Sequence, residues 1–73
     1  MSFKIIHDTY ITYKNGEELH LQYGQLNNGD EFYRFHRKKA NGKFVNRGQA
    51  VINSLADVHK LISQAIEESW EIY

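Results

Sequence analysis

The chain has 73 residues, with nine Lys and Arg against nine Asp and Glu, and it contains no Cys and no Pro. This length allows one domain with a small hydrophobic core, and the absence of Cys excludes disulfides and thiolate-bound zinc as sources of stability. A formal net charge of zero argues against a general nucleic-acid coat protein, because such proteins are basic throughout.

The N-terminal residues, MSFKIIHD, lack the apolar run of about 7–15 residues that marks a signal peptide. No segment of the chain reaches the ~20 apolar residues that a membrane span needs. We therefore expect a cytoplasmic protein with no membrane partner.

Three Asn-Gly pairs occur at intervals of 13 residues. They are Asn15-Gly16, Asn28-Gly29 and Asn41-Gly42. Asn-Gly is the strongest short-range signal for a β-hairpin, because both residues tolerate the positive φ of a tight turn. The spacing therefore predicts an antiparallel meander of four strands, within about residues 3–52.

The segments between these turns have the composition of strands. Thr9 to Tyr13 is β-branched and aromatic, and apolar residues alternate with other residues around Leu19–Tyr23 and Tyr33–Phe35. Phe44 and Ala50–Ile52 supply the predicted fourth strand.

The register of the strands depends on the length of the loops. A two-residue loop at Asn28-Gly29 would set Tyr23 opposite Arg34, which pairs a core-facing ring with a charged side chain. We therefore expect one loop to be longer, or a bulge to intervene.

A helix is predicted over about residues 55–70. Ser54 and Asp57 have the spacing of a capping box, with Ser54 as the N-cap. The residues that then recur at three- and four-residue spacing are Leu55, Val58, Leu61, Ile62, Ala65, Ile66 and Ser69. The predicted fold is thus α+β: a four-stranded antiparallel meander with one C-terminal amphipathic helix packed on one face, in a single domain of residues 1–73.

Trp70, Ile72 and Tyr73 follow the acidic end of this helix. An apolar tail so close to the chain end is expected to pack against the sheet edge or against a second subunit. Because so small a chain without disulfides depends on good packing or on a partner subunit for its stability, we expect a homodimer, with these three residues as interface candidates.

The stretch Phe32–Arg47 contains six cations and no Asp or Glu, so it carries +6 and the other 57 residues carry −6. The six cations are Arg34, Arg37, Lys38, Lys39, Lys43 and Arg47. Strand alternation places Arg34, His36 and Lys38 on one face of the third strand. It places Arg37 and Lys39 on the other.

Cations interleaved with aromatic rings indicate a site for single-stranded nucleic acid, because cations attract phosphates and rings stack on bases. The predicted nucleic-acid-binding residues are Phe32, Arg34, His36, Arg37, Lys38, Lys39, Lys43 and Arg47. A two-stranded ribbon of this kind also fits a duplex major groove. In the plainer interpretation, the charges keep the sheet soluble, block edge pairing or balance the acidic helix.

The segment from Tyr33 to Ile66 contains a basic strand, an Asn-Gly turn, the letters RGQAVI and the helix. In order and spacing it resembles the single-strand-binding transcriptional coactivators of the positive-cofactor-four type. The resemblance implies contacts to the nucleic-acid backbone from Arg34, Arg37, Lys38, Lys39, Lys43 and Arg47. The letters YRFHRKKANGKF, from Tyr33 to Phe44, also resemble the YegP-like repeats, which implies a small dimeric or pseudo-dimeric α+β fold.

The four histidines are His7, His20, His36 and His59. None has the His-x-His or His-x-x-x-His spacing of a metal site, and no Cys is present to assist. No nucleophile elbow or oxyanion-forming glycine loop accompanies the serines. We therefore expect no metal, no cofactor and no enzymatic activity.

The leading hypothesis is a small non-enzymatic nucleic-acid-binding protein that acts through the hairpin 32–47. The alternative is a protein-interaction or regulatory accessory module, of phage or bacterial origin, that acts through the helix and the C-terminal tail.

Overall fold

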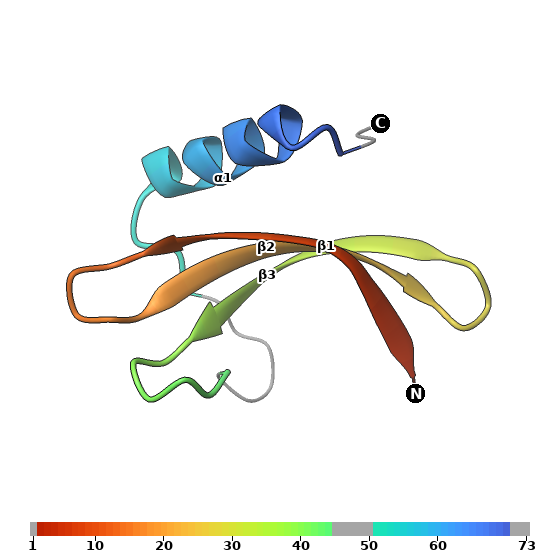
Figure 1. Ribbon diagram of the computed structural model, residues 1–73, viewed down its shortest axis with the longest axis horizontal. Helices are drawn as coiled ribbons and strands as arrows, with labels where there is room; N and C mark the ends of the chain where they lie inside the picture. The colour runs from red at the N-terminus through yellow and green to blue at the C-terminus, as the bar shows by residue number, and fades with distance from the viewer. Residues whose placement is uncertain (1, 45–50, 71–73) are drawn as a thin grey trace.

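Within residues 2–44 and 51–70, which the computed structural model describes, the chain forms a three-stranded antiparallel sheet with a helix across one face (Figure 1). The elements are β1 (Phe3–Thr12), β2 (Glu18–Leu26), β3 (Glu31–Lys38) and α1 (Leu55–Glu67), and the strand order is β1-β2-β3. The α+β class, the antiparallel sheet and the C-terminal helix are confirmed.

A fourth strand is not seen in the described residues, in contrast to the predicted four-stranded meander. Phe44 forms one isolated antiparallel bridge to Lys38, whereas Val51 and Ile52 belong to no strand. The backbone carbonyl of Val51 accepts a hydrogen bond from the Arg37 side chain at 2.9 Å. Val51 is therefore held by the side chain of a β3 residue, and not by the backbone hydrogen bonds that a neighbouring strand would make.

All three Asn-Gly pairs form the same turn, and each loop has three residues instead of two. The residue before each loop donates its N–H to the carbonyl of the residue after it at 2.8 Å: Tyr13 to Glu17, Leu26 to Asp30, and Lys39 to Lys43. Gly16, Gly29 and Gly42 have φ angles of 90°, 94° and 88°. Glycine adopts this left-handed region without the clash that a Cβ would cause. Each Asn side-chain oxygen also accepts the backbone N–H two residues on, at 3.0 Å.

These longer loops decide the register. Tyr23 pairs with Tyr33 and not with Arg34. The expectation of a longer loop or a bulge is confirmed on both counts, because the register of β1 shifts between Ile5 and His7. Figure 1 shows the N-terminal part of β1 bending away from α1, as a bulge permits.

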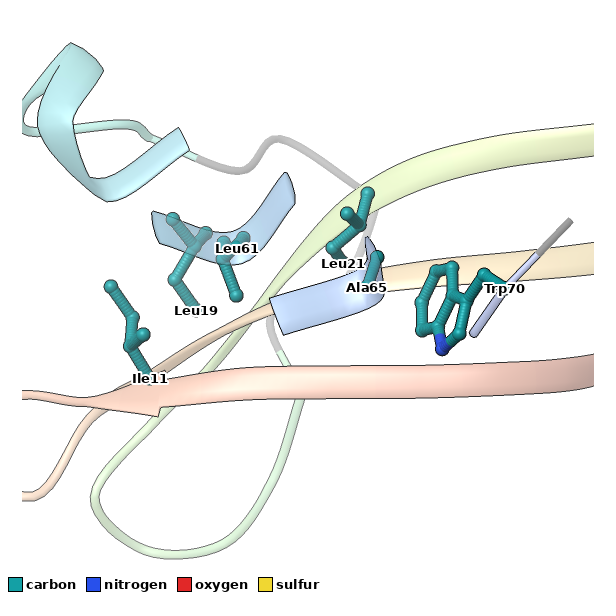
Figure 2. Close-up of a cluster of buried hydrophobic side chains, with 6 residues drawn as sticks. All are labelled: Ile11, Leu19, Leu21, Leu61, Ala65 and Trp70. Carbon is teal, nitrogen blue, oxygen red and sulfur yellow. The ribbon is translucent and has the colours of Figure 1, made fainter. Parts of the chain in front are cut away.

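The core lies between α1 and the first two strands (Figure 2). Its members are Ile11, Leu19 and Leu21 from the sheet, and Leu61, Ala65 and Trp70 from the helix and the segment after it. Leu19 and Leu61 are fully buried. Burial of one such side chain contributes about 1.5–3 kcal/mol, so this pair anchors the helix. Among the described residues, α1 contacts β1 and β2 but not β3.

The predicted N-cap is confirmed. The Ser54 hydroxyl oxygen accepts a hydrogen bond from the Ala56 N–H at 3.1 Å. The reciprocal half of the capping box does not form, because the Asp57 carboxylate accepts a hydrogen bond from the Tyr13 hydroxyl at 2.8 Å. Asp57 therefore ties the first turn of α1 to the end of β1.

The helix ends in a turn that carries the tail back to the sheet. Ser69 has a φ of 63°, its N–H donates to Ile66, and the Trp70 N–H donates to Ala65 at 3.1 Å. This is the hydrogen bonding of a Schellman motif. Trp70 then stacks on His7 of β1, with 5.1 Å between ring centroids. Of the two positions predicted for the tail, Trp70 takes the one against the sheet.

The left-handed conformation of Ser69 predicts that Ser69→Gly will stabilise the protein. Glycine avoids the Cβ penalty at that position, and we expect the free energy of unfolding to rise by up to about 1 kcal/mol in urea titrations. Ser63→Gly, inside the same helix, is the matched control and should lower it by about 0.5 kcal/mol. Destabilisation of both variants would contradict the role given to Ser69.

Candidate nucleic-acid interface

The basic residues of β3 divide between the two faces of the sheet. We call the face that packs against α1 the helix face, and the opposite one the open face. Arg37 pairs with the core residue Leu19, so it lies on the helix face. The residues that alternate with it lie on the open face: Phe32, Arg34, His36 and Lys38. In Figure 1 the open face points away from α1, toward the turn that follows β3.

Arg34 is held at one end of the open face by two aromatic rings. The carbon of its guanidinium lies 4.9 Å from the ring centroid of Phe3 and 5.9 Å from that of Phe32. Its Nε donates a hydrogen bond to the Gln22 side chain at 2.8 Å. Phe32 is seated on Gly24, where a Cβ would come within 2.5 Å of the ring. These contacts fix the guanidinium beside the exposed ring of Phe3.

Phe44 covers the other end of the open face. Its ring stacks on His36 with centroids 4.3 Å apart and meets His20 edge-on at 5.2 Å. The Lys38 ammonium lies 5.5 Å from the centroid of the Phe44 ring. Phe44 therefore joins the open face through its side chain, with part of the ring still exposed to solvent.

His20 anchors the middle of the open face. It is buried, its Nδ1 lies 2.9 Å from an Asp8 oxygen, and its Nε2 lies 2.8 Å from a Glu18 oxygen. Tyr10 stacks on the imidazole at 4.8 Å and remains 49% exposed. The exposed ring of Tyr10 is thus stacked on the fixed ring of His20.

Two acids, Glu17 just before β2 and Glu18 at its start, neutralise part of the predicted positive charge. The Lys38 ammonium lies 3.9 Å from the Glu18 carboxylate. Arg37 donates to Glu17 at 2.8 Å and lies over the Tyr13 ring. Arg37 therefore joins the end of β3 to the loop between β1 and β2, on the helix face of the sheet.

Lys39 and Lys43 flank the turn after β3 and are exposed. Neither ammonium has an ion-pair partner within residues 2–44 and 51–70. Arg47 lies outside the described residues. The helix acid Glu68 accepts hydrogen bonds from the Thr9 hydroxyl and the Trp70 indole, and within the described residues it makes no ion pair with Lys39 or Lys43.

The contact between Arg37 and Glu17 shifts the pKa of both side chains. The hydrogen bond from Arg37 lowers the pKa of Glu17, and the same bond raises the pKa of Arg37. Burial, followed by the hydrogen bond to Asp57, raises the pKa of the Tyr13 hydroxyl. These groups connect the strand ends with the start of α1.

The predicted interface residues of the tail are only partly described. Trp70 is buried in the chain's own core, with 7% of its surface exposed. Ile72 and Tyr73 lie outside the described residues.

Three rings of the open face, Phe3, Tyr10 and Phe44, are absent from the site residues predicted by sequence. Tyr10 reaches this face because it pairs with His20, which in turn pairs with His36. A two-residue first loop would have set Tyr10 opposite Leu21, among the core residues. A first loop of three residues, recognised in the sequence, would have placed Tyr10 on the open face.

In the part of the chain that the structure describes, no three His, Asp or Glu side chains gather as metal ligands do. No helix in that part is long and apolar enough to cross a bilayer. Comparisons with protein-family models, curated proteins and solved structures found no match.

The lowered pKa of Glu17 predicts a loss of stability in acid. A carboxyl whose pKa is lower in the folded than in the unfolded state stabilises the fold above the unfolded value, about 4.3 for Glu. That contribution disappears as the pH falls through the folded pKa. We expect Glu17→Gln to lose less stability than the wild type between about pH 6 and pH 3 in urea titrations.

Glu67→Gln is the matched control for this experiment. Glu67 is an exposed helix residue, and no ion pair of its carboxylate is found within the described residues. Its substitution should leave the acid sensitivity unchanged. Equal acid sensitivity in the wild type and Glu17→Gln would contradict the role of the Arg37–Glu17 contact.

Proposed function

We propose that the open face binds single-stranded nucleic acid, and that the chain acts as a non-enzymatic binding protein. The proposal rests on one observation: partly exposed rings and fixed cations occupy the same face of the sheet. The rings are Phe3, Tyr10 and Phe44, and the cations are Arg34 and Lys38.

Each of these groups has a counterpart in an unpaired strand. Exposed rings stack on bases, and each stacked base contributes ~1–3 kcal/mol. Cations attract phosphates and release counterions, which makes the affinity dependent on salt. In a duplex the bases already stack on one another, so rings on a sheet have no base face to contact. The rings therefore favour a single strand over a duplex.

The turn after β3 extends the positive charge beyond the sheet. Lys39 and Lys43 are exposed there, next to Phe44. Arg47, which lies outside the described residues, is proposed as a further cation of the site.

Asp8 and Glu18 oppose binding because they carry negative charge on the open face. Both are hydrogen-bonded to His20. Charges act over ~8–10 Å at physiological salt, so these two acids reduce the attraction of the cations for phosphates. We therefore expect modest affinity that disappears as the salt concentration rises.

Labelled oligonucleotides test the electrostatic part of the proposal. We expect fluorescence anisotropy titrations at two salt concentrations to show binding of a single strand that weakens with salt, and tighter binding of single strands than of a duplex. Lys43→Glu should weaken binding and reduce the slope of log K against log salt by roughly 0.7 for each phosphate that the variant no longer neutralises.

Lys60→Glu is the matched control, because it makes the same charge change on an exposed helix residue away from the open face. Its effect should be small. No binding to any oligonucleotide at low salt would refute the proposed function. Tighter binding of the duplex would instead favour a ribbon that enters the major groove.

A second pair of variants tests stacking. Tyr10→Leu keeps an apolar cover over His20 but removes the exposed ring, and we expect binding to weaken by roughly tenfold, within the range for one stacked base. Tyr33→Leu is the matched control, because Tyr33 is similarly exposed, at 46% against 49%, but lies on the helix face. Equal effects of the two substitutions would contradict the assignment of binding to the open face.

A further inference from the structure

The Asn-Gly pairs carry a chemical reactivity of their own, in addition to shaping the hairpins. We call the turns with Asn15, Asn28 and Asn41 the first, second and third turns. In such a pair the backbone nitrogen of the glycine can attack the carbon of the Asn side-chain amide. Ammonia leaves and a five-membered succinimide forms, which water then opens to Asp or isoaspartate. Glycine favours the attack because it has no Cβ to hinder it.

In the folded protein a hydrogen bond restrains the attacking nitrogen of each turn. The glycine N–H donates to a backbone carbonyl at 2.9–3.0 Å: Gly16 to Tyr13, Gly29 to Leu26, and Gly42 to Lys39. The nitrogen must leave this bond and lose its proton before it attacks. The reaction therefore passes through a local opening of the turn, and its rate depends on how often that turn opens.

The third turn is tied down less than the other two. The first turn joins β1 to β2 and the second joins β2 to β3, and both pairs of strands stay in register along their length up to the loop. Beyond the hydrogen bonds of the turn itself, the described residues on either side of the third turn share one isolated bridge, between Lys38 and Phe44. The third turn also lies beside the first, because a Cβ at Gly16 would come within 3.4 Å of the Ala40 Cβ. That approach restrains both turns, so the missing strand pairing still makes the third turn open more often.

The charges around the turns also favour reaction at Asn41. Negative charge develops on the glycine nitrogen as it loses its proton, and then on the oxygen of the attacked amide. Lys39 and Lys43 flank Asn41 and are exposed, and nearby cations stabilise such charge. In the second turn, by contrast, the Asn28 side-chain nitrogen donates to the Asp30 carboxylate at 3.1 Å. A carboxylate beside the reacting amide opposes the developing charge.

We propose that Asn41 is a site of spontaneous deamidation in the folded protein, and that it reacts faster than Asn15 and Asn28. Asn15 falls between the other two, because Lys14 and Glu17 next to it carry opposite charges. Water is the only other reactant, and the reaction involves no oxidation or reduction. The proposal is independent of nucleic-acid binding, because the reaction takes place within the free chain.

Deamidation at Asn41 changes both the charge and the shape of the third turn. The new carboxylate cancels one of the two positive charges that Lys39 and Lys43 supply. Isoaspartate also adds one methylene to the main chain, so the hydrogen bonds that close the turn lose their geometry. Phe44, which stacks on His36, follows directly after the turn. The modification therefore acts at the border of the open face.

Peptide mapping of the aged protein tests the order of reaction. The full chain is incubated at neutral pH, digested under mildly acidic conditions that limit further deamidation, and analysed by tandem mass spectrometry. We expect Asn41 to be modified first and Asn28 last, and the spread of the three rates to narrow in urea, where the turns are lost. Faster reaction at Asn15 or Asn28 in the folded protein, or an equal spread in both states, would overturn the proposal.

Charge variants test the role of the lysines. Lys43→Gln and Lys39→Gln should each slow deamidation at Asn41 roughly two- to fivefold, because each removes one cation near the reacting group. Lys43→Arg keeps the charge and should leave the rate unchanged. Lys60→Gln is the matched control, since it makes the same charge change on α1, on the other side of the sheet from this turn (Figure 1). Circular dichroism establishes that the variants are folded. Equal rates in Lys43→Gln and Lys60→Gln, or equal slowing by Gln and Arg at residue 43, would overturn the assignment.

Discussion

The left-handed glycine in each Asn-Gly turn is the constraint on which the rest of the structure depends. With Gly16 and Gly29 at φ near 90°, both loops between paired strands hold three residues, and this number decides which side chains share a face. The core therefore receives Ile11 of β1, while its neighbour Tyr10 lies on the open face over His20. A shorter first loop would exchange the faces of Ile11 and Tyr10 and place a half-polar ring in the core.

One helix is too narrow to cover three strands. An α-helix with its side chains is about 10–12 Å wide and neighbouring strands are ~4.8 Å apart, so α1 lies over β1 and β2, and its backbone does not come close to that of β3. Hydrogen bonds from Thr9 to Glu68 and from Tyr13 to Asp57 hold α1 toward β1. The exposed apolar residues of α1, which include Ile62 and Ile66, and the uncovered face of the sheet both follow from this unequal coverage. The uncovered face of the sheet carries the proposed function.

The cluster of positive charge in the sequence is not a cluster in space. Alternation along β3 sends Arg34 and Lys38 to the open face and Arg37 to the helix face, where Glu17 binds it. Arg37 thereby becomes part of the fold, in contact with strand ends and with the segment before α1. The open face therefore carries less positive charge than the count of +6 suggests. The proposed site depends more on rings that hold a cation in place, as Phe3 and Phe32 hold Arg34.

Local patterns determined the three strands and the helix from sequence alone, whereas the predicted fourth strand is not seen in the described residues. The Asn-Gly pairs marked the hairpins and Ser54 marked the start of the helix, because turns and caps depend on residues only a few positions apart. What only the tertiary structure decided involves residues distant in the chain: the partner of Asp57, the burial of Trp70 and the place of Tyr10 on the open face. The physical reason is that alternation assigns a side chain to one of two faces, whereas loop length and helix placement decide what lies opposite it.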